Sequence, residues 1–171
     1  MSHLVLVGLM ATGKTTVGRL VAEHLDRPLI DSDLQIEART GRAVRDIWRT
    51  DGEPSIRRLE SEVLAEALAT PAPAVIAAAG GVVLAEENRA LLQGADAVVV
   101  WLRARTATQL QRVRSAGDEH RPLLDDDPEG MLERMAIDRT PLYEAVADRI
   151  VDVDDRTPTD VASEVLEVVP G

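Results

Sequence analysis

The 171-residue chain has no cysteine and no phenylalanine, and lysine occurs only once, at Lys14. Without cysteine, the chain can form no disulfide framework, no thiol nucleophile and no thiolate metal site. The aromatic side chains are limited to Trp48, Trp101 and Tyr143, so valine, leucine, isoleucine and alanine must build the core. The hydrophobic share of 45% is normal for a globular protein and too high for a disordered one.

Positive charge is also scarce, because 30 acidic residues against 19 basic ones give a formal net charge of -11. A general binder of nucleic-acid phosphates needs a broad basic face, so we expect no nucleic-acid partner. No apolar run reaches the roughly 18 residues of a membrane helix, and the apolar start lacks a basic leader and a cleavage pattern. We therefore expect a cytoplasmic enzyme or binding domain that is monomeric and does not contact a membrane.

The length fits a single domain over residues 1–171, and its apolar pattern alternates between strands and helices. We expect strands at residues 4–7, 28–30, 74–79, 97–102 and 149–153. Helices are expected at 14–25, 34–70 with breaks at 40–41 and 51–54, 86–92, 106–113, 131–146 with an interruption near Pro141, and 158–169. Continuous apolar strands that alternate with helices predict an α/β fold with a parallel sheet covered on both faces.

A phosphate-binding loop lies between the first strand and the first helix. Residues 8–15 have the sequence G-L-M-A-T-G-K-T, which matches the pattern G-x-x-x-x-G-K-[ST] in full. Glycines let successive backbone N–H groups turn toward a polyanion, and the helix that follows adds the positive end of its dipole. Lys14 would reach the outer phosphates and the Thr15 hydroxyl would bind Mg²⁺, so the segment (the P-loop) predicts nucleotide binding.

Weaker motifs follow the P-loop, and each has an ordinary structural explanation when taken alone. Residues 31–33 (D-S-D) follow the second strand. Their two carboxylates could bind a metal ion and a substrate hydroxyl group, or one of them could simply cap a helix. Residues 57–60 (R-R-L-E) have the spacing of a surface ion pair on a helix. Residues 80–81 (G-G) allow a ligand to approach the backbone or form a plain turn. Residues 121–124 (R-P-L-L) and 139–143 (R-T-P-L-Y) complete the set.

In this order and spacing, the motifs resemble the shikimate kinase family over residues 8–158. The matching positions also include Glu37, Thr40-Gly41, Asp46-Ile47 and Asp51-Gly52-Glu53. The resemblance implies a nucleoside-monophosphate-kinase-like P-loop fold whose five parallel strands run in the order 2-3-1-4-5. It implies a substrate-binding segment at about residues 33–60, a mobile lid at about 114–130, and transfer of the γ-phosphoryl group of MgATP to the 3-hydroxyl of shikimate.

The same resemblance implies roles at the acceptor site. Asp33 would hold the acceptor hydroxyl and act as its base. Arg57 and Arg139 would bind the shikimate carboxylate, a planar anion that suits guanidinium groups. Gly80 and Gly81 would offer backbone N–H groups to the substrate.

At the nucleotide site, the resemblance implies that Asp31 joins Thr15 around Mg²⁺ and that Arg121 comes from the lid to the transferring phosphoryl group. Arg114, seven residues before Arg121, and the turn from Arg156 to Pro158 would flank the adenine. The remaining nucleotide-binding residues lie in the P-loop and the start of its helix: Met10, Ala11, Thr12, Gly13, Lys14, Thr15 and Thr16. Lys14, Arg57, Arg121 and Arg139 would then reverse the acidic charge of the chain within one pocket.

Three positions depart from the family pattern. Ala79 stands where the family usually has glycine, Ile56 where it usually has phenylalanine, and Ala11 where it often has glycine. These differences leave two other hypotheses open: a kinase for another small hydroxylated acid or cyclitol, and a nucleotide-binding module without catalysis. An adenylate or thymidylate kinase is less favoured, because such acceptors need base-stacking contacts and the chain has three aromatic residues.

Overall fold

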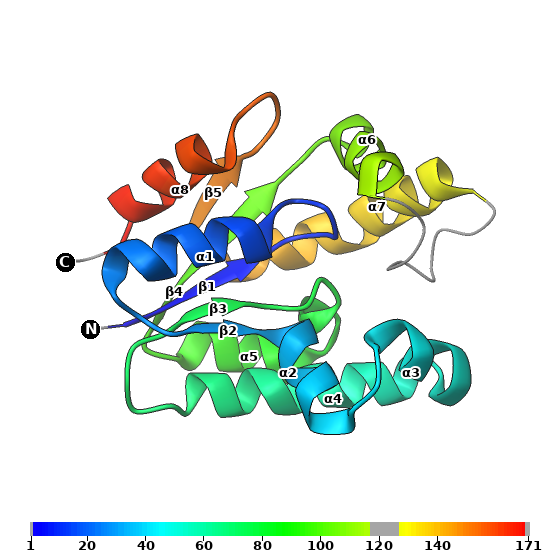
Figure 1. The fold of residues 1–171 in the computed structure, drawn as a ribbon, viewed down its shortest axis with the longest axis horizontal. Coiled ribbons are helices and arrows are strands. Elements are labelled where there is room, and N and C mark those ends of the chain that lie inside the picture. The colour runs from blue at the N-terminus through cyan, green and yellow to red at the C-terminus, as the bar shows by residue number, and fades with distance from the viewer. Residues whose placement is uncertain (1, 117–126, 170–171) are drawn as a thin grey trace.

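The computed structural model describes residues 2–116 and 127–169, and these form a five-stranded parallel sheet with helices on both faces (Figure 1). The strand order is β2-β3-β1-β4-β5, which confirms the predicted order. The strands are β1 His3–Val7, β2 Leu29–Asp31, β3 Val75–Ala77, β4 Ala97–Arg103 and β5 Arg149–Asp152. The central strand β1 pairs with β3 on one side and β4 on the other, and all five of its residues are buried.

The helices account for most of the remaining described residues. They are α1 Lys14–Leu25, α2 Ser32–Thr40, α3 Val44–Asp51, α4 Glu53–Leu68, the short 3-10 helix η1 Val82–Leu84, α5 Glu86–Gly94, α6 Thr106–Ala116, α7 Pro128–Val146 and α8 Pro158–Glu167. None of them, within the residues described, is long and apolar enough to cross a membrane.

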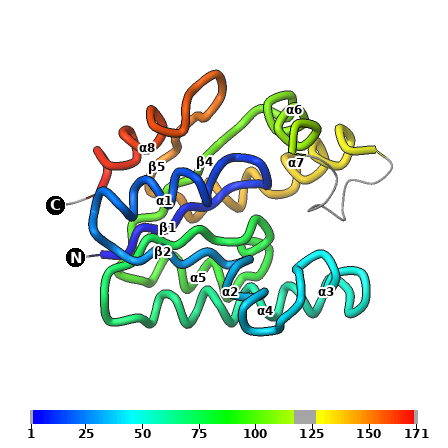
Figure 2. The backbone as a smooth tube through the Cα atoms, viewed as in Figure 1, coloured from blue at the N-terminus to red at the C-terminus, as the bar shows by residue number. Residues whose placement is uncertain are grey.

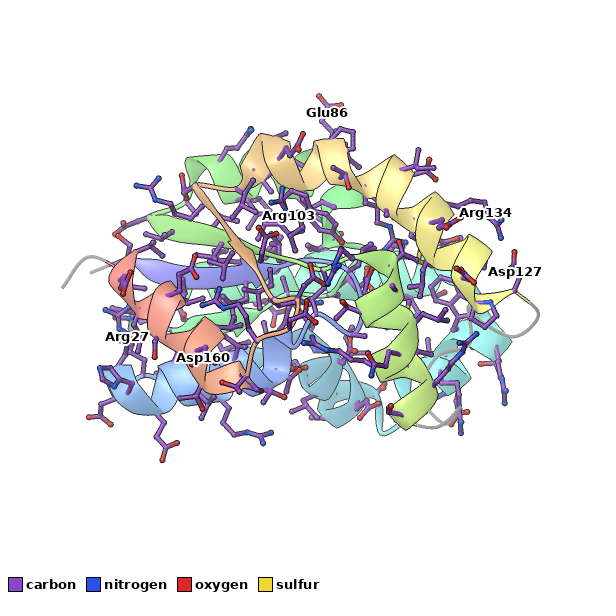
Figure 3. All side chains as sticks on the ribbon, turned by 90° about the horizontal axis from the view of Figure 1, so that it is seen from above. Arg27, Glu86, Arg103, Asp127, Arg134 and Asp160 are labelled. Atoms are coloured by element: carbon purple, nitrogen blue, oxygen red, sulfur yellow. The ribbon has the colours of Figure 1, made fainter. Side chains whose placement is uncertain are left out.

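Alternate side chains of the central strands β1 and β4 belong to two separate hydrophobic clusters. Leu4 and Leu6 of β1 pack with residues of α1 and α8, whereas Val5 and Val7 pack with residues of α4, α5 and α7. Figure 3 shows the sheet between α7 on one side and α1 with α8 on the other. The two-sided burial explains why the strands have continuous apolar sequences, the pattern that predicted a parallel sheet.

The breaks predicted at 40–41 and 51–54 divide the second helical region into α2, α3 and α4. Gly41 follows α2 with φ 66°, and Gly52, with φ 82°, separates α3 from α4. Figure 2 shows α3 and α6 at the end of the molecule toward which β1 and β4 run. The carboxyl ends of the strands therefore lie at this end of the molecule, and ligands of such sheets bind at those ends.

Two expectations about α7 are wrong. The helix begins at Pro128 rather than 131, because Asp127 caps it by accepting a hydrogen bond from the Gly130 N–H at 3.0 Å. It also continues through Pro141 without a break. Proline removes the donor to the carbonyl four residues earlier, but that residue, Ile137, is 73% exposed, so water can replace the lost bond. Figure 3 labels Asp127 and Arg134, which form an ion pair at 3.7 Å in the first part of α7.

The structure assigns helix to both ends of the segment expected to form a lid. Residues 114–116 belong to α6 and residues 128–130 to α7, so these positions are not the loop that their polar composition suggested. The rest of the expected lid, including Arg121, lies outside the described residues. The strand limits also shift by one or two residues: Asp31 ends β2, and Ala78 and Ala79 follow β3 rather than belonging to it.

Candidate functional site

A cleft of about 400 Å³ opens at the carboxyl ends of β1, β2 and β3. It brings together the P-loop, the start of α2, one side of α4, the turn after β3 and the middle of α7. The lining residues predicted from the sequence are Met10, Ala11, Gly13, Lys14, Thr15, Thr16, Asp31, Asp33, Arg57, Gly80, Gly81 and Arg139. The sequence interpretation did not assign roles in it to Val44, Trp48, Glu60, Ala77 and Ala78, and it noted Ile56 and Ala79 only as departures.

The P-loop leaves the backbone donors of α1 available to a ligand. Gly13 precedes the helix in the left-handed conformation, with φ 92°, and no side chain caps the first turn. Because the first N–H groups of a helix have no partners within it, this end favours an anion. The Lys14 ammonium donates to the Gly8 and Leu9 carbonyls at 2.8 and 2.9 Å, which holds it beside the same end of the helix.

Thr12 lies beneath the loop rather than in the cleft lining. It is 2% exposed, and its hydroxyl donates to the Leu9 carbonyl at 2.9 Å. Ala11, next to it, has φ 61°, a left-handed conformation that costs a non-glycine residue about 1–2 kcal/mol. The alanine noted as a departure from the family pattern is therefore accommodated at the expense of local backbone strain.

Thr15 and Asp31 lie together at the edge of the P-loop. The Thr15 hydroxyl donates to Asp31 Oδ2 at 2.5 Å. The other carboxylate oxygen of Asp31 caps α2, accepting from the Asp33 and Leu34 N–H groups at 3.1 and 3.2 Å. The described residues contain no group of three or more acidic or histidine side chains placed as a complete metal site. A hydroxyl and one carboxylate nevertheless suit Mg²⁺, which binds proteins through few oxygen ligands and completes its shell with phosphates and water.

Asp33 projects from the first turn of α2 into the cleft, where solvent reaches it through the opening while protein surrounds the other sides. The residue is exposed overall, but desolvation by the protein around its carboxyl group raises the pKa of Asp33; the neighbouring Asp31 carboxylate raises it further, whereas Lys14 lowers it. Burial disfavours the ionised form of a carboxyl group, and a like charge adds to the effect. Asp33 is therefore a more basic carboxylate than an ordinary aspartate.

Arg57 is held by three side chains in the described structure. Its Nη1 donates to both oxygens of Glu60 at 2.9 and 2.7 Å, and its Nη2 donates to Glu53 at 3.0 Å. The guanidinium carbon lies 5.3 Å from the centre of the Trp48 ring, within the range of a cation–π contact. Burial raises the pKa of Glu60, although the charge of Arg57 opposes this shift. Arg57 is thus oriented before any ligand arrives.

The pair Arg57–Glu60 is more than the surface ion pair that its spacing suggested. The Glu60 side chain is 7% exposed and that of Arg57 is 21% exposed, and both line the cleft. The neighbouring Arg58 side chain is 65% exposed and pairs with Glu62, as expected of surface residues. A Cβ at Gly81 would overlap the Arg57 guanidinium, so glycine at this position lets Arg57 keep the orientation that Glu53 and Glu60 give it.

The turn after β3 is fixed from the opposite side by α7. The buried Tyr143 hydroxyl donates to the Gly80 carbonyl at 2.5 Å. The Tyr143 ring stacks on Trp101, with the ring centres 5.5 Å apart. Burial raises the pKa of Tyr143, while the charge of Arg139, four residues earlier on the same helix, lowers it. Arg139 itself is 8% exposed and lines the same cleft as Asp33 and Arg57.

The described lining of the cleft carries no net charge. Its cationic residues are Lys14, Arg57 and Arg139, and its acidic residues are Asp31, Asp33 and Glu60. The described lining therefore does not have the positive charge that the sequence predicted for the pocket. Glu60 adds a negative charge that the prediction did not include, and Arg121 lies outside the described residues. Compared with a whole chain of net charge -11, the cleft is still much less acidic.

A second, shallower groove of about 710 Å³ lies between α6 and the turn before α8. Its described lining consists of Thr108, Gln111, Arg112, Ser115, Ala116, Asp155, Arg156 and Thr157. Arg156 is thus in the groove, where it pairs with Glu164 at 2.5 Å. Pro158 and the exposed Arg114 are not among the described residues that line it. Arg112 and Thr108 lie one helical turn apart on α6, so helical spacing could have identified both. Counting seven residues back from Arg121 gave Arg114 instead.

Comparison with known proteins gives the following matches. The model of the shikimate kinase family matches residues 10–170. A shikimate kinase from Symbiobacterium thermophilum is 45% identical over 166 residues, covering 96% of this chain and 94% of that protein. A shikimate kinase from Thermobifida fusca is 42% identical, covering 97% of this chain and 94% of the relative.

Solved structures give a similar result. The shikimate kinase from Acinetobacter baumannii in complex with shikimate has a TM-score of 0.92 and 36% identity, covering 98% of this chain and 92% of that one. A gluconokinase from Sinorhizobium meliloti has a TM-score of 0.60 and 17% identity, covering 97% of this chain and 90% of that one, a similarity of fold alone.

Proposed function

The chain belongs to the shikimate kinase family, and we propose that it transfers the γ-phosphoryl group of ATP to the 3-hydroxyl of shikimate. The observation that carries the proposal is a single cleft that joins the P-loop to Asp33, Arg57 and Arg139. A phosphate-binding loop alone supports only nucleotide binding. The Asp33 carboxylate and the two guanidinium groups in the same cleft support an acceptor that has both a hydroxyl group and a carboxylate.

Arg57 and Arg139 bind the carboxylate of the acceptor from two sides of the cleft. A guanidinium group pairs with a carboxylate through two parallel N–H donors, so two arginines set both the position and the orientation of a small acid. Arg57 arrives preoriented by Glu53, Glu60 and Trp48, which reduces the ordering required on binding. The Gly81 backbone, which passes directly against Arg57, lies beside the same part of the substrate.

Asp33 accepts the proton of the acceptor hydroxyl. Its raised pKa favours this role, because a stronger base removes a hydroxyl proton more readily once it is ionised. Lys14 and the N–H groups at the start of α1 stabilise the negative charge on the phosphoryl oxygens. Thr15 and Asp31 would hold Mg²⁺, which neutralises phosphate charge when bound.

The nucleotide base occupies the second groove, beside Arg112 and the turn containing Arg156 and Thr157. Arg112 replaces Arg114 in this proposal, because Arg112 is among the described residues that line the groove. The groove and the cleft meet at the P-loop, since the Arg112 guanidinium also donates to the Ala11 carbonyl at 3.0 Å. A nucleotide can therefore extend from the groove to the phosphate site.

The test is a coupled assay of ADP release with shikimate, with other hydroxylated acids and with cyclitols that lack a carboxylate. We expect turnover that depends on shikimate and Mg²⁺, with little for acceptors without a carboxylate. Turnover only with a different acceptor would make the chain a kinase of another substrate. Calorimetric binding of MgADP without turnover of any acceptor would instead indicate a nucleotide-binding module.

A further inference from the structure

The first four carbonyl groups of the P-loop, those of residues 8–11, each accept a hydrogen bond from a side chain. Lys14 donates to the carbonyls of Gly8 and Leu9. The next two carbonyls have donors from α6, a helix that begins more than ninety residues later in the chain. Gln109 Nε2 donates to the Met10 carbonyl at 2.9 Å, and Arg112 Nη1 donates to the Ala11 carbonyl at 3.0 Å.

These two hydrogen bonds act on the backbone angles of one residue. The Met10 carbonyl belongs to the peptide unit before the Ala11 Cα, and the Ala11 carbonyl belongs to the peptide unit after it. Because peptide units are planar, the orientations of these two units define φ and ψ of Ala11. Ala11 has φ 61°, in the left-handed region that alanine adopts only at a cost. Gln109 and Arg112 therefore hold Ala11 in a conformation that it does not favour by itself.

Among the described residues, no other side-chain hydrogen bond explains a glutamine at position 109. Its exposed fraction is 0%, and it is not among the described residues that line the cleft or the groove. Its side-chain oxygen Oε1 is buried without a hydrogen-bond partner in the part of the chain that the structure describes. A buried amide that satisfies only its nitrogen is costly, so the hydrogen bond to the P-loop is the interaction that favours glutamine over an apolar residue.

We propose that Gln109 is a positioning residue of the nucleotide site, which keeps a P-loop containing Ala11 instead of glycine in its phosphate-binding conformation. It fixes the Met10–Ala11 peptide from outside the loop, so that the loop carbonyls point away from the ligand and the N–H groups remain directed toward the phosphates. Arg112 completes the arrangement but also lines the groove, so Gln109 is the residue that isolates the effect. The inference rests on the proposed nucleotide site and is independent of the identity of the acceptor.

The first experiment compares Gln109→Met with Gln93→Met. Methionine keeps the length of glutamine and removes its amide. Gln93, which is exposed, is a control for the hydrogen bond itself, because its Nε2 also donates to a backbone carbonyl at 2.9 Å, that of Ala145. We expect Gln109→Met to weaken MgADP binding, measured by calorimetry, about three- to tenfold and to raise the KM for ATP similarly. Shikimate binding and its KM should change less than about twofold, and Gln93→Met should leave both ligands unaffected.

A second experiment separates positioning from stability. In an Ala11→Gly background the left-handed conformation has no steric cost, so Gln109→Met should there weaken MgADP binding less than about twofold. Gln109→Asn retains the amide but is one methylene too short to reach the Met10 carbonyl, and it should behave like Gln109→Met. If Gln109→Met lowered the melting temperature and left MgADP affinity unchanged, the residue would be merely structural and the inference wrong. Absence of MgADP binding by the wild-type chain would instead overturn the proposed function.

Discussion

Replacing Tyr143 by phenylalanine would remove the hydroxyl group that supports the cleft wall at Gly80 and leave the ring in place. The hydroxyl donates to the Gly80 carbonyl at 2.5 Å from a side chain that is 1% exposed. Loss of this donor from the partly buried carbonyl costs about 1–2 kcal/mol. For a chain of this size, the melting temperature should fall by about 2–8 °C, while the stacking on Trp101 is retained.

The same variant should impair acceptor binding more than nucleotide binding. Without the hydroxyl, the Gly80–Gly81 peptide is free to tilt, which moves the Gly81 backbone relative to Arg57. We expect the KM for shikimate to rise about three- to tenfold in the coupled assay, with a smaller change in the KM for ATP. Tyr143→Leu removes the ring as well, so it should lower the melting temperature further but raise the KM for shikimate to a similar extent. An unchanged KM for shikimate in both variants would refute the reasoning.

Two further substitutions test the acceptor site. Asp33→Asn should lower turnover about 100- to 10,000-fold and leave MgADP binding near that of the wild type, because only the acceptor loses its base. Since the folded-state pKa of Asp33 is raised, its ionised form destabilises the fold, so Asp33→Asn should raise the melting temperature at neutral pH. This difference in melting temperature should shrink as the pH falls, and wild-type turnover should fall as Asp33 becomes protonated. Thermal melts measure the first effect and a pH–rate profile measures the second. If the melting temperature of Asp33→Asn were below that of the wild type at neutral pH, the assigned environment of Asp33 would be wrong. Arg139→Lys should mainly raise the KM for the acceptor, because a single ammonium replaces a bidentate guanidinium, and an unchanged KM would count against carboxylate binding there.

Much of the fold could be predicted because its information is local. Residues 4–7 and 97–102 are continuously apolar, which is typical of short strands buried on both faces. Gly41 and Gly52 separate helices at the predicted breaks, since both adopt positive φ angles. The errors also have physical causes. Proline at 141 was expected to interrupt α7, and it does not because Ile137, whose carbonyl loses its donor, lies on the exposed side of the helix.

The candidate site could be predicted only in part. Lys14, Thr15, Asp31 and Asp33 lie at or just after the ends of strands that finish at the same edge of the sheet, so their convergence follows from strand order. Trp48 was not assigned to the cleft, because nothing in the sequence places α3 against α4. In the structure Trp48 packs beside the cluster that contains Ile56, so one aromatic ring still lines the cleft although phenylalanine is absent from the chain.

The sequence by itself determined the chemistry that the chain can perform: one lysine in a phosphate-binding loop, a strand-end aspartate and two arginines at family spacing. A motif of consecutive residues carries its own geometry, which is why the P-loop could be recognised without coordinates. Only the tertiary structure decided how that geometry is maintained. The hydrogen bonds from Tyr143 to Gly80 and from Gln109 to Met10 join residues 63 and 99 positions apart, and no local pattern specifies such contacts. They depend on the packing of α7 and α6 at the carboxyl ends of the strands.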